Sequence, residues 1–259
     1  MKIKIYQLDA FTDTLFGGNP AAVCILKEWP DDILLQKIAM ENNHAETAFI
    51  APNQNGYDIR WFTTALEVDL SAHATLASAY VIFTHLNHKE DTIKFASKSG
   101  ELTVTKDKDY ITLNFPAVPI VRDLSKNFIG KALGVTPTEI WRGIDYVAVL
   151  ANEDLVRTCE PHFDLIERLD ARGITVTAKG KKADFVSRFF GPQVGIEEDY
   201  ATGSSHCYLA PYWAKQLKKT KLYAEQLSTR IGKVYCEVKD NRVLLSGKVV
   251  PYLIGELEI

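Results

Sequence analysis

The sequence lacks an excess of charge of either sign, and it lacks any apolar run long enough to cross a bilayer. Its 259 residues contain 30 Lys and Arg against 33 Asp and Glu, a formal net charge of −3. That balance gives no electrostatic reason to expect nucleic acid or an anionic membrane as a partner. No apolar stretch approaches the roughly 20 residues of a transmembrane helix. The first residues, MKIKIYQLDAF, alternate like a strand and do not form the apolar core of a signal peptide.

Cysteine is scarce, and no two cysteines form a CxxC pair. The four are Cys24, Cys159, Cys207 and Cys236. This spacing argues against a disulfide or zinc framework and favours the reducing cytoplasm as the protein's location. Counting alone leaves room for one catalytic thiol. Cys207, however, continues an apolar helical run, and we interpret it as a core thiol.

Several catalytic motifs are also absent. The FGGNP turn at Phe16–Pro20 has neither the Gly-Lys-Ser/Thr of a P-loop nor the GxGxxG of a dinucleotide fold. The sequence contains no GxSxG elbow and no HExxH. Single histidines in separate helical runs are poor candidates for a metal site. The sequence therefore predicts neither a metal nor a cofactor.

The segments that are present predict a mixed α/β chain. Strand-like runs with period-two alternation are frequent, and helices are expected over residues 30–43, 71–86 and 204–217. The first helix would place Ile33, Leu34, Ile38 and Met40 near one face. The other two are apolar nearly all round, a pattern typical of helices buried on every side.

The two halves of the chain resemble each other. RWFTTALEVDLSAHATLASAY (residues 60–80) and RFFGPQVGIEEDYATGSSHCYLAPYW (residues 188–213) share an Arg-aromatic-Phe strand end, then acidic residues, then Ser-small-His opening a helix. In this alignment His73 matches His206, which lies half the chain further along. The repeat predicts duplicated α/β domains that face each other. We place one domain at residues 1–116, completed by a C-terminal strand at 249–259, and the other at residues 117–248.

The starts of the two buried helices could bind an anion. The first turn of a helix presents unpaired N–H groups and a partial positive charge. Ser71 and Ala72 in one half, and Gly203 and Ser204 in the other, are small enough to let a ligand approach that backbone. Each serine is equally well explained as a simple N-cap.

Two carboxylates stand out near these helices. Glu46 lies at the start of an apolar strand, a setting that suits a group that must take up and release a proton, although an exposed junction residue would look the same. The matching stretch of the second half, GITVTAKG, has no acid, so one half alone would supply the proton carrier. Asp199 could bind a substrate amine or hydroxyl. Its neighbours Glu197 and Glu198 are better explained as residues of the turn before the helix.

Taken together, four stretches resemble the PhzF-like phenazine-biosynthesis family and cover the chain nearly end to end. They are DAFTDTLFGGNPAAV (Asp9–Val23), ETAF (Glu46–Phe49), EVDLSAHATLA (Glu67–Ala77) and EDYATGSSHCYLAPYW (Glu198–Trp213). The resemblance implies an α+β fold of the diaminopimelate-epimerase-like type, with two pseudo-symmetric domains. Each would be a mostly antiparallel, curved sheet wrapped around a central buried helix. It also implies a homodimer.

The resemblance implies roles for individual residues. Glu46 would be the catalytic acid/base, with Asp199 and His73 as further catalytic residues. The substrate-binding residues would be Ser71, Ala72, Thr202, Gly203, Ser204 and Asn19. Many family members have Cys-Gly-His or Gly-Gly-His where this chain reads Ser71-Ala72-His73. Ser71 stands where related two-base epimerases place one catalytic cysteine, so the chain lacks a two-thiol pair.

The sequence therefore predicts an isomerase that works without a cofactor on a small carboxylate-bearing metabolite. Its reaction would be similar to the isomerisation of trans-2,3-dihydro-3-hydroxyanthranilate, with Glu46 moving a proton in the inter-domain cleft. Two alternatives remain open from the sequence: epimerisation or racemisation of an amino or hydroxy acid, and a non-catalytic small-molecule-binding protein on the same fold.

Overall fold

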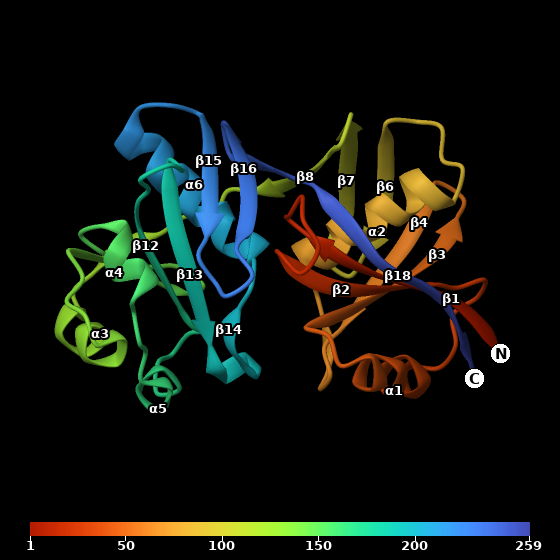
Figure 1. The fold of residues 1–259 in the computed structure, drawn as a ribbon, viewed down its shortest axis with the longest axis horizontal. Helices are drawn as coiled ribbons and strands as arrows, with labels where there is room; N and C mark the ends of the chain where they lie inside the picture. The colour runs from red at the N-terminus through yellow and green to blue at the C-terminus, as the bar shows by residue number, and fades with distance from the viewer. The chain divides into compact units, whose positions relative to one another are not determined.

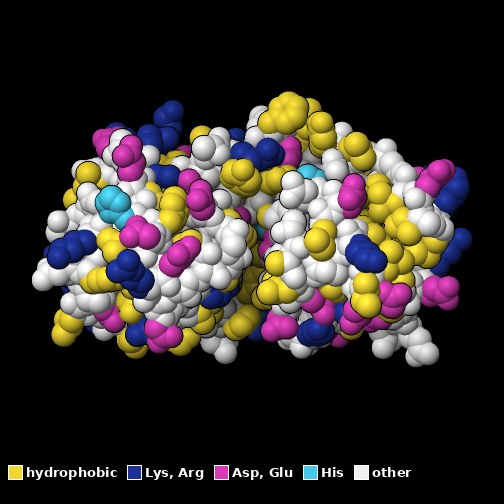
Figure 2. Space-filling view, turned by 90° about the horizontal axis from the view of Figure 1, so that it is seen from below, with side chains coloured by type: hydrophobic (Ala, Val, Ile, Leu, Met, Phe, Trp, Pro, Cys, Tyr) yellow, Lys and Arg dark blue, Asp and Glu magenta, His cyan; other side chains and the backbone are white.

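The computed structural model describes residues 1–259 as two compact units. Unit 1 comprises residues 1–114 and 246–259, and unit 2 comprises residues 115–245. The sequence-based boundaries lay at 116/117 and 248/249. Strands dominate both units and helices are few, so the chain is α+β. No helix combines the length and apolar character that spanning a membrane requires. Lys, Arg, Asp and Glu side chains are interspersed over the face shown in Figure 2.

Unit 1 is built on one mixed sheet. Strand β1 lies between β18 and β2 and is antiparallel to both, while β2 and β3 are parallel. Strand β4 is antiparallel to β3, and β6, β7 and β8 continue the sheet from its other edge. The strands are β1 (Lys2–Ala10), β2 (Asn19–Ile25), β3 (Glu46–Asn53), β4 (Gly56–Phe62), β5 (Glu67–Val68), β6 (Thr92–Ser97), β7 (Gly100–Asp107), β8 (Tyr110–Pro116) and β18 (Val249–Glu258).

Helix α2 (Ala72–His85) is the buried core of unit 1, as its all-round apolar character predicted. Every residue from Ala72 to Ala79 is buried, as are Val81 and Ile82. The helix packs on β1, β2 and β3, and Figure 1 shows it in yellow beside these strands. Because side chains alternate across a strand, the apolar side chains on the other face of the sheet must be buried by a second element.

Helix α1 (Asp32–Asn42) covers that second face with a face that matches the predicted one in part, because Ile38 is buried and Leu34 packs against the core as expected. Leu35, Ile38 and Ala39 are its buried residues, whereas Ile33 is 68% and Met40 56% exposed. The buried residues pack with Ile5, Cys24, Phe49 and other side chains of the sheet. The helix is short and carries few apolar residues, so its sequence was compatible with two overlapping apolar faces. Packing against the sheet determines which of them is buried.

Unit 2 repeats this strand order. Strands β11 and β12 are parallel, β13 is antiparallel to β12, and β15 runs parallel to β13, as β2, β3, β4 and β6 do in unit 1. The strands are β9 (Val121–Asp123), β10 (Glu139–Arg142), β11 (Tyr146–Val149), β12 (Ile174–Lys179), β13 (Phe185–Gly191), β14 (Ile196–Asp199), β15 (Lys221–Gln226), β16 (Gly232–Lys239) and β17 (Arg242–Gly247).

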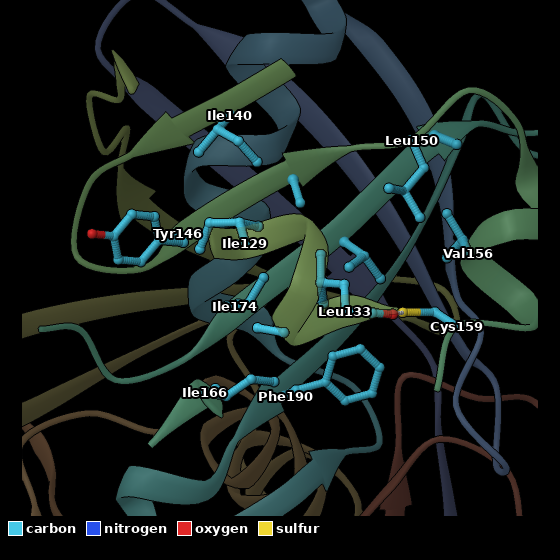
Figure 3. Close-up of a cluster of buried hydrophobic side chains, with 14 of the residues drawn as sticks. Ile129, Leu133, Ile140, Tyr146, Leu150, Val156, Cys159, Ile166, Ile174 and Phe190 are labelled. Carbon is cyan, nitrogen blue, oxygen red and sulfur yellow. Dashed lines mark hydrogen bonds between the residues drawn. The ribbon is translucent and has the colours of Figure 1, made fainter. Parts of the chain in front are cut away.

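The helices of unit 2 also take two roles. Helix α6 (Gly203–Leu217) is the counterpart of α2: its residues from Ser205 to Ala210 are buried, and it packs on β15 and β16. The short helices α3 (Lys126–Leu133), α4 (Glu153–Arg157) and α5 (Phe163–Ile166) cover the other face, together with the 3-10 turn η1 (Pro192–Val194). Figure 3 shows the apolar cluster that they form with the strands, in which Leu133, Ile174 and Phe190 take part.

Candidate active site

Glu46 is the first residue of β3, and its side chain faces His73 in the first turn of α2. Its Oε2 lies 2.9 Å from His73 Nε2, and the two side chains are only 14% and 6% exposed. The two atoms do not meet at a hydrogen-bonding angle, so the contact is a close approach of an acid and an imidazole. The structure thus brings together two residues that the sequence separates by a strand, a hairpin and a loop.

Asn19 completes this group from the start of β2. Its Nδ2 lies 3.2 Å from His73 Nδ1, and the residue is fully buried. An amide NH2 group can only donate, so Nδ1 accepts and the proton of the neutral ring lies on Nε2, the nitrogen that faces Glu46. Asn19 therefore sets the tautomer of the imidazole.

The turn before Asn19 holds it in place. Gly18 has φ +57°, and a Cβ atom there would lie 2.1 Å from the carbonyl oxygen of Ala10, so only glycine fits. The buried carboxylate of Asp9 accepts a hydrogen bond of 2.8 Å from the backbone N–H of Phe16, which itself has φ +65°. The geometry of the FGGNP turn therefore fixes the position of Asn19 at the start of β2.

The start of α2 has the expected cap. Ser71 is extended, with φ −135° and ψ 116°, and its side chain accepts from the backbone N–H of Ala74 at 3.4 Å. Ser71 and Ala72 are 5% and 8% exposed. The backbone of the first turn, including Ala72 and His73, therefore lies directly beside the Glu46–His73 pair.

In unit 2, Asp199 ends β14 just before α6. Its carboxylate accepts a hydrogen bond of 2.5 Å from the hydroxyl of Thr202, and its backbone oxygen accepts one of 2.7 Å from Gln226 Nε2. Gln226 is fully buried and also accepts from the backbone N–H of Thr202 at 2.8 Å. Asp199 and Thr202 are therefore held in one hydrogen-bonded group.

The expectation that Ser204 is the N-cap of α6 is wrong. The helix begins at Gly203 and its cap position is Thr202, whose hydroxyl makes no capping bond; it donates to Asp199 and accepts from Gln226 Nε2. Ser204 matches Ser71 in the alignment of the two halves, but α6 starts earlier than α2 relative to that match. Ser204 consequently lies inside the first turn, where its Oγ accepts a hydrogen bond of 3.3 Å from Arg172 Nη2.

Glu198 is also more than a turn residue. It receives two parallel hydrogen bonds from Arg188, of 2.7 Å from Nε and 2.9 Å from Nη2. In unit 1, Arg60 makes the same two bonds to Glu67, with the same two lengths. The arginine lies on the antiparallel strand β4 or β13 and the acid on the short strand after it. The matched pairs therefore fix the correspondence between the two units.

That correspondence makes Gly173 the counterpart of Glu46. Arg60 pairs with Phe49 in the sheet, and Arg188 pairs with Val176. Glu46 precedes Phe49 by the same spacing as Gly173 precedes Val176. A Cβ atom at Gly173 would lie 2.1 Å from the carbonyl oxygen of Phe190. Unit 2 therefore has no room for any side chain where unit 1 carries the acid.

His206 and Cys207 are core residues, and for Cys207 this confirms the interpretation of the sequence. The imidazole of His206 is fully buried and its Nδ1 donates to the carbonyl oxygen of Thr202 at 2.8 Å. Burial lowers the pKa of His206 to about 4 despite that bond, so the ring stays neutral at neutral pH. Burial also raises the pKa of the Cys207 thiol to about 12, which leaves no thiolate for catalysis.

The sequence analysis missed a second group of polar residues in unit 2, centred on Asp145 and Arg172. Asp145 is fully buried and receives hydrogen bonds from Arg172 Nε at 3.0 Å and Nη2 at 2.7 Å. The signal was present, because Asp145 stands in the apolar run GIDYVAVLA just as Glu46 stands in its own strand. No set of three or more His, Cys, Asp or Glu side chains in residues 1–259 is arranged to hold a metal ion.

Two α+β units with the same strand order, each with a helix buried against its sheet, define a fold shared with epimerase-like proteins. A predicted epimerase from Pseudomonas aeruginosa superposes with a TM-score of 0.79 at 17% identity, covering 98% of this chain and 99% of its own. This likeness concerns the fold, which is the diaminopimelate-epimerase-like fold named from the sequence.

The family follows from closer matches. Residues 8–255 match the family model PhzC-PhzF, described as phenazine biosynthesis-like protein, and the chain belongs to this family. A PhzF-family phenazine biosynthesis protein from Enterococcus faecalis superposes with a TM-score of 0.98 at 42% identity, each chain covered completely. An uncharacterized isomerase from Pseudomonas aeruginosa is 44% identical over 259 residues, the full length of both chains. The protein is thus isomerase-like and of the PhzF type.

Proposed function

We propose that this protein is an isomerase that moves a proton within a small carboxylate-bearing metabolite, with Glu46 as the acid/base. The observation that carries the proposal is the pairing of Glu46 Oε2 with His73 Nε2 at 2.9 Å, with Asn19 at the other ring nitrogen. A carboxylate that does not lie in a well-directed hydrogen bond is available to accept a proton from a substrate carbon. The proposed steps use only side chains of this chain, and cofactor independence is part of the proposal.

In the proposed reaction, the proton leaves one carbon of the substrate for Glu46 and returns from Glu46 to another carbon. The electron pair of the broken C–H bond moves into the conjugated system of the substrate while the double bond shifts. His73, with its proton on Nε2, would donate to a substrate oxygen as charge develops there. Backbone N–H groups at a helix start, Ala72–His73 or Gly203–Ser204, would bind the substrate carboxylate. Asp199 would accept from a substrate amine or hydroxyl.

The absence of a second proton carrier favours isomerisation over two-base epimerisation. Epimerisation that inverts a centre commonly uses one base on each face of the substrate. In unit 2 the place that corresponds to Glu46 is Gly173, where no side chain fits. A two-thiol pair is absent too, because Ser71 stands where related two-base epimerases place one catalytic cysteine. A single carboxylate that both takes and returns the proton is consistent with this arrangement.

The proposal is tested with Glu46→Gln. Cyclic and acyclic amino-hydroxy carboxylates are incubated with the protein in deuterated water, and proton NMR follows loss of C–H signals and shift of unsaturation. We expect the native chain to catalyse exchange and isomerisation of at least one such compound. Because glutamine cannot take up the proton, Glu46→Gln should lower that rate by about 10²-fold or more.

Glu41→Gln is the matched control, since Glu41 is exposed on α1 and the charge change is the same. Circular dichroism verifies that both variants are folded. An unchanged rate in Glu46→Gln would refute the assignment. Chiral analysis of the product separates the alternatives: inversion of a centre without movement of unsaturation would indicate an epimerase. Binding without exchange in the native chain would indicate a non-catalytic protein.

A further inference from the structure

The Asp145–Arg172 group of unit 2 holds a guanidinium in one fixed orientation. Asp145 accepts two parallel hydrogen bonds from Arg172 and a third, of 3.0 Å, from the hydroxyl of Tyr208. Thr175 Oγ1 lies 2.6 Å from the same hydroxyl. Asp145, Thr175 and Tyr208 are fully buried. A planar, bidentate Arg–carboxylate pair whose acid has further bonds leaves the guanidinium little freedom to turn.

Unit 1 has nothing comparable at the corresponding positions. Ala21 is the sheet partner of Glu46 on β2, and Asp145 occupies the corresponding position at the start of β11, next to Gly173. Tyr208 corresponds to Thr75 in the alignment of the two halves. Where unit 1 has small side chains beside a catalytic acid, unit 2 has a buried carboxylate and a tyrosine that support an arginine. Because buried charges are costly unless paired, the duplicated fold alone does not account for this group.

Arg172 also reaches the first turn of α6. Its side chain is 42% exposed, Nη2 also donates to Ser204 Oγ at 3.3 Å, and Nη1 makes no hydrogen bond to the protein. Burial lowers the pKa of Arg172, but the hydrogen bonds and charge of Asp145 outweigh that effect and raise it. The guanidinium is therefore charged at every physiological pH. Asp199 is near enough to interact with it electrostatically, so the region offers one anion beside the cation.

We propose that Arg172 is a specificity-determining residue that binds the carboxylate of the substrate through Nη1, beside Ser204 and the first turn of α6. The inference rests on the proposed function, since it presumes a carboxylate-bearing substrate. It adds that Arg172 is the residue that favours a negatively charged substrate group. Asp145 is the positioning residue, because it orients the guanidinium and does not itself face the ligand. Asp199 then favours a substrate that carries a hydrogen-bond donor near its carboxylate and disfavours a simple dianion.

A purely structural role for the Asp145–Arg172 pair is the rival explanation, and charge discrimination separates the two. The probes are 2-aminobenzoate and 2-aminobenzamide, which have nearly the same shape and differ in charge. Their dissociation constants are measured by NMR titration on the native chain, Arg172→Met, Arg172→Lys and Asp145→Asn. Thermal unfolding of each variant is recorded in parallel.

We expect the native chain to bind the acid more tightly than the amide. Arg172→Met should weaken binding of the acid by about 10-fold or more, the loss of a charged hydrogen bond, and change binding of the amide by less than about twofold. Arg172→Lys keeps the charge but not the two-pronged geometry of the guanidinium. Its affinity for 2-aminobenzoate should therefore lie between those of the native chain and of Arg172→Met. Asp145→Asn should also weaken binding of 2-aminobenzoate, but by a smaller factor than Arg172→Met does. Arg168→Met, an exposed arginine in the same unit, is the control and should change neither constant.

Equal weakening of acid and amide in Arg172→Met, or an unchanged acid-to-amide ratio in the folded Arg172→Lys variant, would overturn the proposal. If Arg172→Met does not fold, the ratio of the dissociation constants for the acid and the amide in Arg172→Lys tests the proposal by itself. A native-like probe ratio in Glu46→Gln with full turnover would refute the proposed acid/base and leave the Arg172 proposal standing.

Discussion

At the scale of single residues, the two matched arginines make the same ion pair in the two units. Arg60 and Arg188 each hold a carboxylate with two parallel hydrogen bonds, and their side chains are 21% and 13% exposed. Arg188 Nη1 also donates to the backbone oxygen of Cys159 at 2.7 Å, which ties a loop to the sheet. Such pairs contribute to stability mainly because neither partner can be removed without leaving the other partly buried and unpaired.

The Arg60–Glu67 pair predicts a pH-dependent contribution to stability. Hydrogen bonds from Arg60, aided by Lys98, lower the pKa of Glu67 below its ordinary value against the effect of burial. A lowered folded-state pKa means that the carboxylate stabilises the fold above its unfolded-state pKa and loses that contribution as the pH falls through the folded-state value. Glu67→Gln should therefore reduce the free energy of unfolding by about 1–3 kcal/mol at neutral pH, and the difference should shrink as the pH falls below the ordinary glutamate pKa of about 4.3.

Urea denaturation of both chains at several pH values measures this difference. Glu101→Gln is the control, because Glu101 is 59% exposed and its contact with Lys94 is 3.5 Å long. That change should cost less than about 1 kcal/mol at any pH. A Glu67→Gln penalty that grows on acidification would contradict the assigned direction of the pKa shift.

The residue scale also shows how far sequence reasoning reached at the candidate site. Glu46 was chosen from its local pattern and His73 through the family resemblance, and the structure brings them together at 2.9 Å. Arg172 was missed because its neighbours in sequence say nothing about the buried acid far earlier in the chain. A contact between strands that are parallel neighbours depends on register, which one short segment does not encode.

At the scale of elements, α2 and α6 are the same buried helix with different beginnings. Their all-round apolar sequences were enough to predict that both are buried. The start of α6 was not predictable in the same way. Ser71 and Ser204 match in sequence, but α2 begins directly after Ser71 whereas α6 begins at Gly203, before Ser204. The match in sequence did not fix the position of the cap.

This difference predicts unequal effects of the same substitution. Ser71→Ala removes a capping oxygen and should lower the free energy of unfolding by about 1 kcal/mol. Ser204→Ala removes no cap and should change it by less than about 0.5 kcal/mol. Thermal and urea unfolding of the two variants, each the control of the other, measures the effect. Equal losses would show that Ser204 has a capping role that its position inside the helix argues against.

At the scale of the whole molecule, unit 1 is discontinuous in the chain and unit 2 is continuous. Strand β18 pairs with β1 along its length, and the backbone N–H of Ile259 donates to the oxygen of Met1 at 2.8 Å. Figure 1 shows the two ends of the chain side by side in unit 1. The strand repeat could be predicted from the duplicated sequence motifs. We expected a strand at residues 249–259 to complete the first domain, but its partner β1 and their register join segments about as far apart as the chain allows, and no local pattern specifies them.

Removal of residues 249–259 should therefore damage one unit selectively. Without β18, the edge of β1 loses its whole ladder, and hydrogen exchange should show loss of amide protection in β1 and β2. Strands β12 and β13 should keep their protection. Glu256→Ala, which removes only an exposed contact with Lys2, is the control and should leave all four strands protected. Equal loss of protection in both units would contradict the selective effect.

The late position of β18 has a consequence during translation. The ribosome completes every strand of unit 2 before it makes β18, so the unit that begins second has its full sequence first. At a synthesis rate of about 5–20 residues per second, the nascent β1 waits on the order of ten seconds or more for its partner. Throughout that interval its open edge can pair with another nascent chain or with a chaperone. In each nascent chain the edge of β1 that pairs with β18 therefore stays unpaired until β18 has been synthesised.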